Sequence, residues 1–397
     1  CSGGNSHRRR SFDATDSAPS VLTRGPIPAF RRPERPPTAF RCRRARAARE
    51  DGERGWRSAA PMKRLFTMLM AVSLLAALWV PVSAKVSMPL FDFEAHRGGR
   101  DLYPENTLAS FRNALVLGVT TLEMDVQLTA DLVPVLSHNP RLTYTLTRDP
   151  SGQWVKQGQE PVIHNLLLSD LKRFDVGGIN PADTEYFADH AKLQKVCPGE
   201  RVPTLEEIFD LCDRMGNHTV RFNIETKSYA TEPSYGVDPY TFAAILHAII
   251  QRRHLENRCM IQSFDWRTLL EIRRIDKDMT TVALTSEVPE WGEEGWYRRV
   301  GQPGCSPWMA GLDIDDFHGD YVAAAHQINA DVVSPYYKEL TPALVAEAHK
   351  LGMKVVPWTI NAPPEMEREI GWGVDGIITD RPDLLKQVLV ARKIRYQ

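Results

Sequence analysis

The sequence predicts an α/β fold, a (β/α)8 TIM barrel with an insertion after the third strand. Two observations favour this fold. Short apolar runs rich in Val, Ile and Leu recur along the chain, and most are separated by stretches with the apolar spacing of helices. Eight strands that alternate with helices build a parallel barrel of about 250 residues. An open doubly wound sheet is the alternative, because periodicity does not distinguish a closed sheet from an open one.

The elements of this fold follow the chain in order. The expected strands are Leu90–Ala95, Thr121–Val126, Val133–Ser137, Val220–Ile224, Cys259–Phe264, Thr281–Leu284, Ala330–Ser334 and Lys354–Trp358. The expected helices are Thr107–Leu117, Thr204–Met215, Pro239–Arg252, Trp266–Asp276, Pro342–Leu351 and Asp383–Arg392. Asn106 or Thr107 is suited to cap the first helix. Gly118, Gly216 and Gly352 are placed to end three helices.

Two long irregular stretches interrupt the alternation. Over sixty residues separate the strand ending at Ser137 from the helix near Thr204, so about residues 141–202 are expected to form an insertion. Loops of that length usually serve a site. The second stretch, Glu287–Asp320, is rich in Trp, Gly and Pro. It is expected either to shape the mouth of the site or to pack as a surface loop.

The first 61 residues differ in kind from the rest. They contain 14 Arg and no Lys and lack periodic apolar residues, so they are expected to be disordered. Their basic composition also fits a nucleic-acid-binding arm or a transit peptide. The first methionine, however, is Met62. We therefore expect residues 1–61 to be an upstream segment outside the native product.

Residues 62–84 are expected to form a cleavable signal peptide. Met62-Lys63-Arg64 is a short basic start, and the apolar run Leu65–Val80 is followed by small residues up to Ala84. An uncleaved membrane anchor is the alternative, although the run is short for a span. Cleavage would leave residues 85–397 as the barrel, periplasmic or secreted and without a stable membrane anchor.

Charge and cysteine content narrow the partners of residues 85–397. Residues 1–84 hold 16 of the 49 Lys and Arg but 6 of the 50 Asp and Glu, so the remainder carries about −11 rather than −1. An acidic domain disfavours nucleic acid as a partner. Four cysteines remain, without zinc-type spacing, and they allow zero, one or two structural disulfides: Cys197, Cys212, Cys259 and Cys305.

Polar side chains gather at the carboxyl ends of the expected strands, where barrel enzymes place their catalytic residues. In chain order they are His96, Arg97, Glu123, Asp125, His138, Glu225, Lys227, Gln262 and Trp358. All of them should converge on one rim of the barrel. Since a random polar residue has no reason to recur at that end, the pattern predicts an active site.

Three of these residues point to a metal. Glu123 and Asp125 are two apart on a strand, so both side chains face the same way. With Glu225 they offer hard oxygen ligands, which suit one divalent cation, Ca²⁺ or Mg²⁺, better than zinc.

The remaining charged groups indicate the reaction. Arg97 and Lys227 add positive charge that suits a phosphate. His96 and His138 supply an acid and a base near neutral pH. Together with a metal, these groups predict cleavage of a phosphodiester.

Each residue has a structural alternative. A lone histidine is more often hydrogen-bonded in the fold than catalytic. Glu123 and Asp125 are also compatible with a solvent-facing edge strand, and Glu225 and Lys227 with an ion pair of small value. An aromatic such as Trp358 often only packs at the end of a barrel. The joint placement of these residues is what favours function.

The motifs resemble one family. They are His96-Arg97-Gly98, Pro104-Glu105-Asn106-Thr107, Glu123-Met124-Asp125, His138-Asn139, Glu225-Thr226-Lys227 and Gln262-Ser263-Phe264. This series resembles the glycerophosphodiester phosphodiesterase family over nearly all of residues 85–397, and the leader resembles its secreted bacterial members.

The resemblance implies hydrolysis of glycerophosphocholine, glycerophosphoethanolamine and similar small molecules to glycerol 3-phosphate and an alcohol. It implies an attack by a glycerol hydroxyl that forms a cyclic phosphate, which water then opens. The implied roles are acid–base catalysis for His96 and His138, metal binding for Glu123, Asp125 and Glu225, and substrate contact for Arg97, Lys227, Gln262 and Trp358.

One departure and two rival functions remain. Many members of the family have Asp after the second histidine, where this chain has Asn139, and an amide cannot bias a histidine proton as a carboxylate does. A phospholipase D of the sphingomyelinase type shares this kind of site but needs an exposed apolar surface at the rim. A non-enzymatic surface or solute-binding protein on the same barrel is the other alternative.

Overall fold

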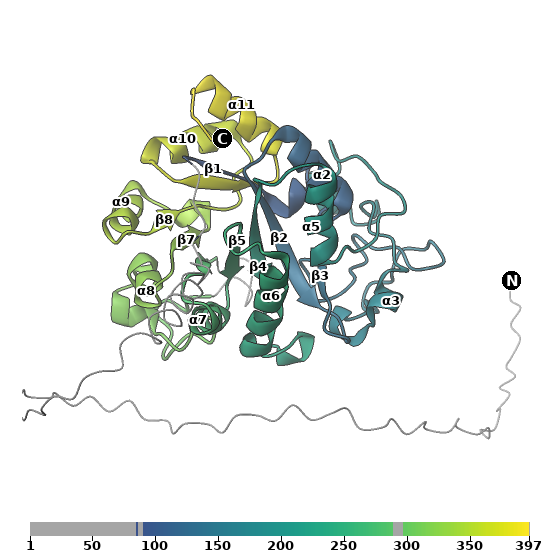
Figure 1. Ribbon diagram of the computed structural model, residues 1–397, viewed down its shortest axis with the longest axis horizontal. Helices are drawn as coiled ribbons and strands as arrows, with labels where there is room; N and C mark the ends of the chain where they lie inside the picture. The colour runs from purple at the N-terminus through teal and green to yellow at the C-terminus, as the bar shows by residue number, and fades with distance from the viewer. Residues whose placement is uncertain (1–84, 86–89, 289–296, 397) are drawn as a thin grey trace, which may run out of the picture. The chain divides into compact units, whose positions relative to one another are not determined.

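A computed structural model of the chain describes residues 85, 90–288 and 297–396 (Figure 1). The expected Arg-rich segment 1–61 and signal peptide 62–84 lie outside the described residues and stay predictions. Within the described ranges, every helix is too short or too polar to cross a bilayer.

The described chain is organised around one sheet. Its strands are β1 (Asp92–Ala95), β2 (Thr121–Leu128), β3 (Pro134–Leu136), β4 (Arg221–Thr226), β5 (Cys259–Ser263), β6 (Thr280–Thr285), β7 (Val332–Pro335), β8 (Lys354–Val355) and β9 (Gly376–Thr379). The order is β8-β7-β6-β5-β4-β2-β1-β9, and neighbours along this path are parallel.

The two ends of this path meet. The Asp375 N–H donates to the Val355 carbonyl at 2.8 Å, and the Ile378 N–H donates to the Pro357 carbonyl at 3.0 Å. These bonds join the β9 segment to the β8 segment, so the sheet is a nearly closed barrel. The predicted barrel is confirmed, and the open doubly wound sheet is excluded.

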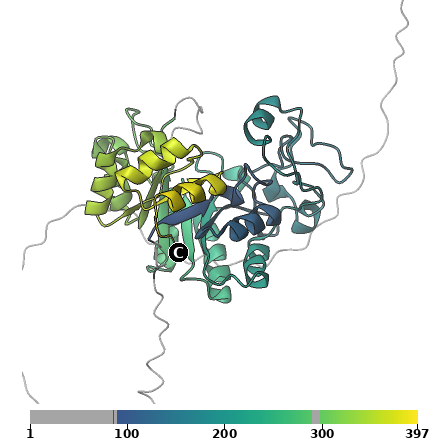
Figure 2. The same ribbon diagram turned by 90° about the horizontal axis from the view of Figure 1, so that it is seen from above.

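Helices surround the sheet in Figures 1 and 2. They are α2 (Leu108–Leu117), α3 (Leu168–Leu171), α4 (Thr184–His190), α5 (Leu205–Arg214), α6 (Pro239–Arg253), α7 (Trp266–Ile275), α8 (Tyr321–Gln327), α9 (Pro342–Lys350), α10 (Pro363–Trp372) and α11 (Pro382–Ala391). Short 3-10 turns are η1 (His96–Gly98), η2 (Ile163–Asn165), η3 (Pro233–Tyr235), η5 (Ile314–Phe317) and η6 (Tyr337–Glu339). Thr107 caps α2 by accepting from the Ser110 N–H, and Gly118 ends the helix at a φ of 78°.

Two strands differ from the expectation. The run Val133–Ser137 forms β3, but β3 pairs antiparallel with β2 and lies beside the barrel path. Its connection to β2 spans only residues 129–133, and a parallel pairing needs a crossover of a dozen residues or more. The eighth barrel strand is instead β9, a four-residue run that the periodicity did not reveal.

The insertion follows β3, as expected. It contains η2, α3 and α4 and packs around its own small apolar cluster, which consists of Val135, Leu142, Ile163, Leu171 and Val202. This cluster anchors residues 141–202 beside the barrel.

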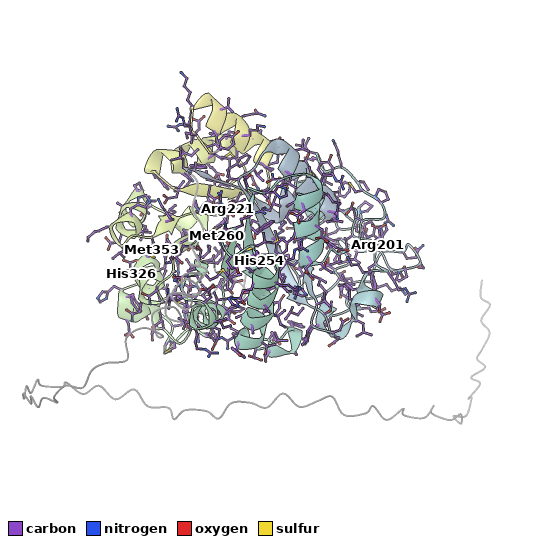
Figure 3. All side chains as sticks on the ribbon, in the orientation of Figure 1. Arg201, Arg221, His254, Met260, His326 and Met353 are labelled. Carbon is purple, nitrogen blue, oxygen red and sulfur yellow. The ribbon has the colours of Figure 1, made fainter. Side chains whose placement is uncertain are left out.

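The interior of the barrel is divided into an apolar and a polar part. One apolar side chain comes from each of β5, β6, β7, the β8 segment and β9, and the five form one cluster: Met260, Val282, Val332, Val356 and Ile378. The strands β1, β2 and β4 carry buried charged or polar residues instead, among them Asp92, Glu94 and Asn223. Figure 3 labels Met260 and Arg221 near the centre of the ring of strands. The polar part lies on the strands that also carry the site.

Gly376 provides a test of barrel closure. Gly376 faces Asp92 across the β1–β9 pair, and an added Cβ would lie 2.5 Å from the Asp92 Cβ and carbonyl oxygen. Gly376→Ala should lower the free energy of unfolding by about 1–3 kcal/mol, because the backbone must move to relieve that overlap. Urea unfolding measures this change.

Gly371 is the matched control, since it lies in α10 with open space around its Cβ position. Gly371→Ala should raise stability by up to about 1 kcal/mol. Equal effects of the two substitutions would contradict the close approach of β9 to β1.

Candidate active site

A cleft of about 940 Å³ opens at the carboxyl ends of the strands. Its lining includes eight of the nine predicted site residues: His96, Arg97, Glu123, His138, Glu225, Lys227, Gln262 and Trp358. Asp125 is fully buried next to them, with one oxygen 3.2 Å from Arg97 Nε and the other 3.7 Å from Lys227 Nζ. The structure therefore brings all nine residues together.

The tight turn after β1 aims the first two of them. Arg97 has a φ of 51°, and its N–H donates to Glu123 Oε2 at 2.9 Å. Gly98 has a φ of 83°, and an added Cβ would lie 2.4 Å from Ser110 Oγ. Only glycine fits this position without displacing the start of α2, which explains the His-Arg-Gly sequence.

The three predicted metal ligands form one buried cluster. Asp125 and Glu225 are direct neighbours on β2 and β4, and Glu123 precedes Asp125 on the same face. One oxygen from each carboxylate lies within 4.8 Å of the others. Asp125 Oδ1 accepts no hydrogen bond from the residues described here. Three buried hard oxygens and this unsatisfied acceptor fit one divalent cation.

Burial and mutual repulsion control the charge of this cluster. Burial raises the pKa of Glu123 well above its ordinary value, and the charges of Asp125 and Glu225 raise it further. Burial also raises the pKa of Glu225, to about 7, although Lys227 opposes the shift. The pKa of Asp125 moves the other way, because Arg97, His138 and Lys227 outweigh the effect of burial. Protons therefore compete with a cation for Glu123 and Glu225.

The two histidines have different partners. His96 Nδ1 lies 2.5 Å from Asp380 Oδ1, and His96 Nε2 accepts from Arg97 Nε at 3.2 Å. This arrangement assigns the His96 proton to Nδ1. His138 Nδ1 instead lies 2.8 Å from the amide oxygen of Asn139.

These partners separate the proton affinities of the two rings. Burial lowers the pKa of both histidines. The negative charge of Asp380 opposes that effect at His96. At His138, Arg97 and Lys227 lower the pKa further, so it lies well below its ordinary value.

Several residues of the site were not predicted. Asp380 follows β9, and its carboxylate also contacts Arg100 Nε at 2.9 Å and Asn361 Nδ2 at 2.9 Å. It was missed because the strand before it was missed. Asn106 donates to Asp125 Oδ2 at 2.9 Å. Its place in the Pro-Glu-Asn-Thr motif was the available signal.

Gln262 lines the cleft, but its amide serves the carboxylates. Its NH₂ group donates to Glu123 Oε1 at 3.0 Å, and its oxygen accepts from Asn223 at 2.9 Å. These bonds orient Glu123. Direct contact of Gln262 with substrate stays a prediction.

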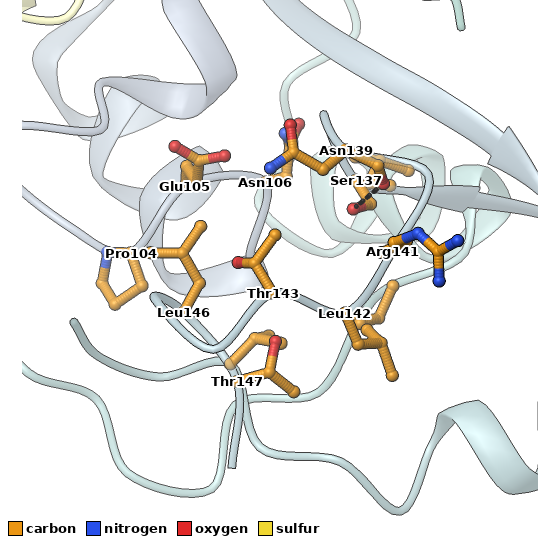
Figure 4. Close-up of a pocket in the computed structure, with 13 residues that line it drawn as sticks. Pro104, Glu105, Asn106, Ser137, Asn139, Arg141, Leu142, Thr143, Leu146 and Thr147 are labelled. Carbon is orange, nitrogen blue, oxygen red and sulfur yellow. Dashed lines mark hydrogen bonds between the residues drawn. The ribbon is translucent and has the colours of Figure 1, made fainter. Parts of the chain in front are cut away.

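The insertion also supports the site. The Tyr186 hydroxyl on α4 donates to Glu105 Oε2 at 2.8 Å, and Glu105 Oε1 accepts from Arg97 Nη1 at 3.1 Å. Figure 4 shows a second, much smaller cavity between the insertion and the segment that precedes α2. Its lining includes Glu105, Asn106 and Arg141. At about 40 Å³ it has room for water but not for a substrate.

The fold and the site together define a barrel hydrolase of phosphodiesters. The model of the glycerophosphoryl diester phosphodiesterase family matches residues 96–384. A glycerophosphodiester phosphodiesterase from Caldanaerobacter subterraneus subsp. tengcongensis is 30% identical over 292 residues, which cover 73% of this chain and 94% of that protein. The chain therefore belongs to the glycerophosphoryl diester phosphodiesterase family and is an enzyme of that hydrolase type.

Solved structures are similar as well. A glycerophosphoryl diester phosphodiesterase homologue from Silicibacter pomeroyi DSS-3 has a TM-score of 0.67 and 32% identity, over 79% of this chain and 97% of that one. A phosphodiesterase from Oleispira antarctica in complex with sn-glycerol-3-phosphate shares the fold, with a TM-score of 0.52 and 20% identity, over 75% of this chain and 96% of that one. Membership of the family excludes the non-enzymatic alternative.

Asp380 and Asn139 provide a paired test of the histidine environments. Asp380→Asn should lower kcat by about 100-fold or more, because the amide no longer stabilises positive charge on His96. Asn139→Asp should keep activity and move the His138 limb of the pH profile to higher pH by about one unit, since a carboxylate favours the charged ring. The value of kcat at its optimum measures the first change, and the pH dependence of kcat/KM measures the second. An unchanged kcat in Asp380→Asn together with an unchanged profile in Asn139→Asp would contradict these assignments.

The cation should stabilise the protein more at high pH. In the cation-free protein, the raised pKa of Glu225 contributes stability that is full below the unfolded value of 4.5 and is lost as pH rises through about 7. A bound cation replaces the proton. At 100 times its dissociation constant, Ca²⁺ or Mg²⁺ should raise Tm by about 5 °C or more at pH 8 and by less at pH 5.5.

Differential scanning fluorimetry with EDTA and with added cation measures these shifts. Glu225→Gln is the control, and it should reduce the Tm shift at pH 8. A shift that is equal at the two pH values, or larger at pH 5.5, would count against the carboxylate site.

Proposed function

We propose that this protein hydrolyses glycerophosphodiesters, such as glycerophosphocholine and glycerophosphoethanolamine, to glycerol 3-phosphate and an alcohol. One observation carries the proposal. The two histidines, the positively charged side chains of Arg97 and Lys227, and the carboxylate cluster all line or adjoin a single cleft. The similar proteins support it, because one is named for this activity and another holds sn-glycerol-3-phosphate.

The charged residues bind the phosphate and the cation. Glu123, Asp125 and Glu225 would hold one Ca²⁺ or Mg²⁺ ion, which supplies a Lewis acid for the phosphoryl oxygens when bound. Lys227 Nζ lies 2.8 Å from Glu225 Oε1, so the Lys227 charge is next to the cluster and available to a phosphate oxygen. Arg97 supplies the second positive charge.

The histidines move the protons. His96 accepts the proton of the glycerol hydroxyl at Nε2 as the glycerol oxygen bonds to phosphorus. Asp380, at Nδ1 of the same ring, stabilises the imidazolium that forms. His138, protonated when the negative charge of the bound phosphodiester offsets Arg97 and Lys227, gives its Nε2 proton to the alcohol oxygen as the bond between that oxygen and phosphorus breaks. Water then opens the cyclic phosphate, with the two proton transfers reversed. Trp358 walls the glycerol end of the cleft.

The proposal extends to the cell compartment. The basic start, short apolar run and small residues of 62–84 support export through a cleavable signal peptide. The mature enzyme would then act in the periplasm or outside the cell, on glycerophosphodiesters that reach it there.

The test is release of glycerol 3-phosphate from glycerophosphocholine by the purified protein. EDTA should abolish release, and Ca²⁺ or Mg²⁺ should restore it, which also ranks the two cations. His96→Ala and His138→Ala should each lower kcat by about 100-fold to 10⁴-fold. His326→Ala is the matched control, because His326 is exposed on α8 outside the cleft (Figure 3).

No release under either cation, from protein shown to be folded by circular dichroism, would overturn the proposal. Micellar sphingomyelin is the second substrate in that experiment. Preferential cleavage of sphingomyelin would indicate the lipid phosphodiesterase instead.

A further inference from the structure

The half of the cleft beyond Lys227 is lined by aromatic rings. Tyr229 and Tyr235 come from the loop after β4, Phe264 follows β5, and Tyr297 and Trp308 lie in the stretch between β6 and η5. These rings belong to segments that are far apart in the sequence. Nothing in the phosphate chemistry requires them, so they suit another part of the substrate.

These rings are held in place. Phe264 and Tyr297 stack with centroids 4.0 Å apart, and Trp308 packs edge-to-face on Tyr297 at 5.0 Å. The Trp308 carbonyl accepts from the Trp266 N–H at 2.8 Å, and the Ser306 hydroxyl donates to the Tyr297 carbonyl. These contacts fix Phe264, Tyr297 and Trp308 relative to one another, which lowers the entropy cost of binding a ligand against them.

The aromatic half begins at the expected position of the phosphate. Lys227 lines the same cleft as Tyr229 and Tyr297, and Tyr229 follows it by two residues in the chain. Trp358 packs edge-to-face on Phe264 with centroids 5.4 Å apart, so the glycerol wall and these rings adjoin. A phosphodiester bound at Lys227 with its glycerol against Trp358 would place its alcohol group beside Tyr229, Tyr297 and Trp308. The charged residues beside these rings should therefore determine which alcohol group the cleft binds best.

The charge of this half selects among the alcohols. Among the described residues beside these rings, Glu232 carries a charge, and its side chain is exposed. Arg141 lies 5.3 Å from the Tyr235 ring, but it lines the small neighbouring cavity and not the cleft. Among the described residues, a cationic group that enters this part of the cleft therefore meets aromatic rings and the Glu232 carboxylate.

Ligand chemistry separates the candidates. A trimethylammonium group has no hydrogen to donate, and aromatic faces with a nearby carboxylate are its preferred surroundings. A primary ammonium needs several oxygen acceptors, and a polyol needs paired hydrogen bonds. An acyl chain is apolar and forms no favourable interaction with the Glu232 carboxylate.

We infer that Tyr229, Phe264, Tyr297 and Trp308, with Glu232 at the rim, bind the trimethylammonium end of glycerophosphocholine and so make choline the preferred leaving alcohol. The inference rests on the proposed function and adds the determinant of its specificity. These residues contact the alcohol and not the reacting atoms.

The experiment compares kcat/KM for three substrates of the full chain with its cation. They are glycerophosphocholine, its neutral analogue with a 3,3-dimethylbutyl group, and glycerophosphoethanolamine. The choline ester should be favoured roughly tenfold over the neutral analogue of the same shape. It should also be favoured over the ethanolamine ester.

Three variants test the residues. Trp308→Leu and Glu232→Gln should each lower the ratio between the choline ester and the neutral analogue severalfold, mainly through KM, and Trp308→Phe should retain part of it. Tyr240→Leu is the control, because Tyr240 is a half-exposed aromatic on α6 outside the cleft. It should leave the ratio unchanged.

Binding of tetramethylammonium, measured by calorimetry at constant ionic strength against ammonium, separates this inference from the proposed function. Equal kcat/KM for the choline ester and its neutral analogue, or a preference for the ethanolamine ester, would overturn the inference while the function stands. The opposite result is a protein that hydrolyses none of the three esters but binds tetramethylammonium, with binding abolished by Trp308→Leu. That result would overturn the proposed function while the inferred trimethylammonium site stands.

Discussion

Three buried carboxylates within 4.8 Å of one another are the constraint on which the rest of the site depends. Two charges at that distance repel by about 3 kcal/mol even at an effective dielectric constant of ~20. Two effects reduce this repulsion. Arg97 pairs with Asp125 and Lys227 pairs with Glu225. The pKa values of Glu123 and Glu225 are also raised, which favours their neutral forms. The same groups that make the cluster tolerable are those that receive a phosphate. Stability and function therefore use one set of charges.

A chain of hydrogen bonds connects the carboxylate cluster to polar residues deeper in the barrel interior. Asn223 donates to Glu94 at 2.9 Å and to Gln262 at 2.9 Å, and Gln262 in turn donates to Glu123. Burial and the charge of Asp92 raise the pKa of Glu94 well above its ordinary value, so this carboxyl keeps its proton to higher pH than an exposed glutamate does. The apolar cluster around Met260 fills the part of the interior formed by β5, β6, β7, the β8 segment and β9.

Much of this architecture could be predicted from the sequence, because alternating apolar runs and strand-end polar residues are local patterns. The nine site residues were found this way, and the structure places all of them together. Tertiary pairing was not local. The antiparallel partner of β3 and the short strand β9 depend on contacts that periodicity does not encode, and Asp380 was lost with β9. The partner of each histidine likewise required the fold, since Asp380 is 284 residues from His96.

The central claim is that Glu123, Asp125 and Glu225 hold one divalent cation beside the phosphate. The most direct measurement is a crystal structure with Mn²⁺ as a stand-in cation and glycerol 3-phosphate, with anomalous data collected at the manganese edge. The account predicts one anomalous peak among the three carboxylates, with phosphate oxygens near Arg97 and Lys227. The absence of a peak there, or a peak only at the second acidic cluster of Asp101, His190 and Asp380, would contradict it.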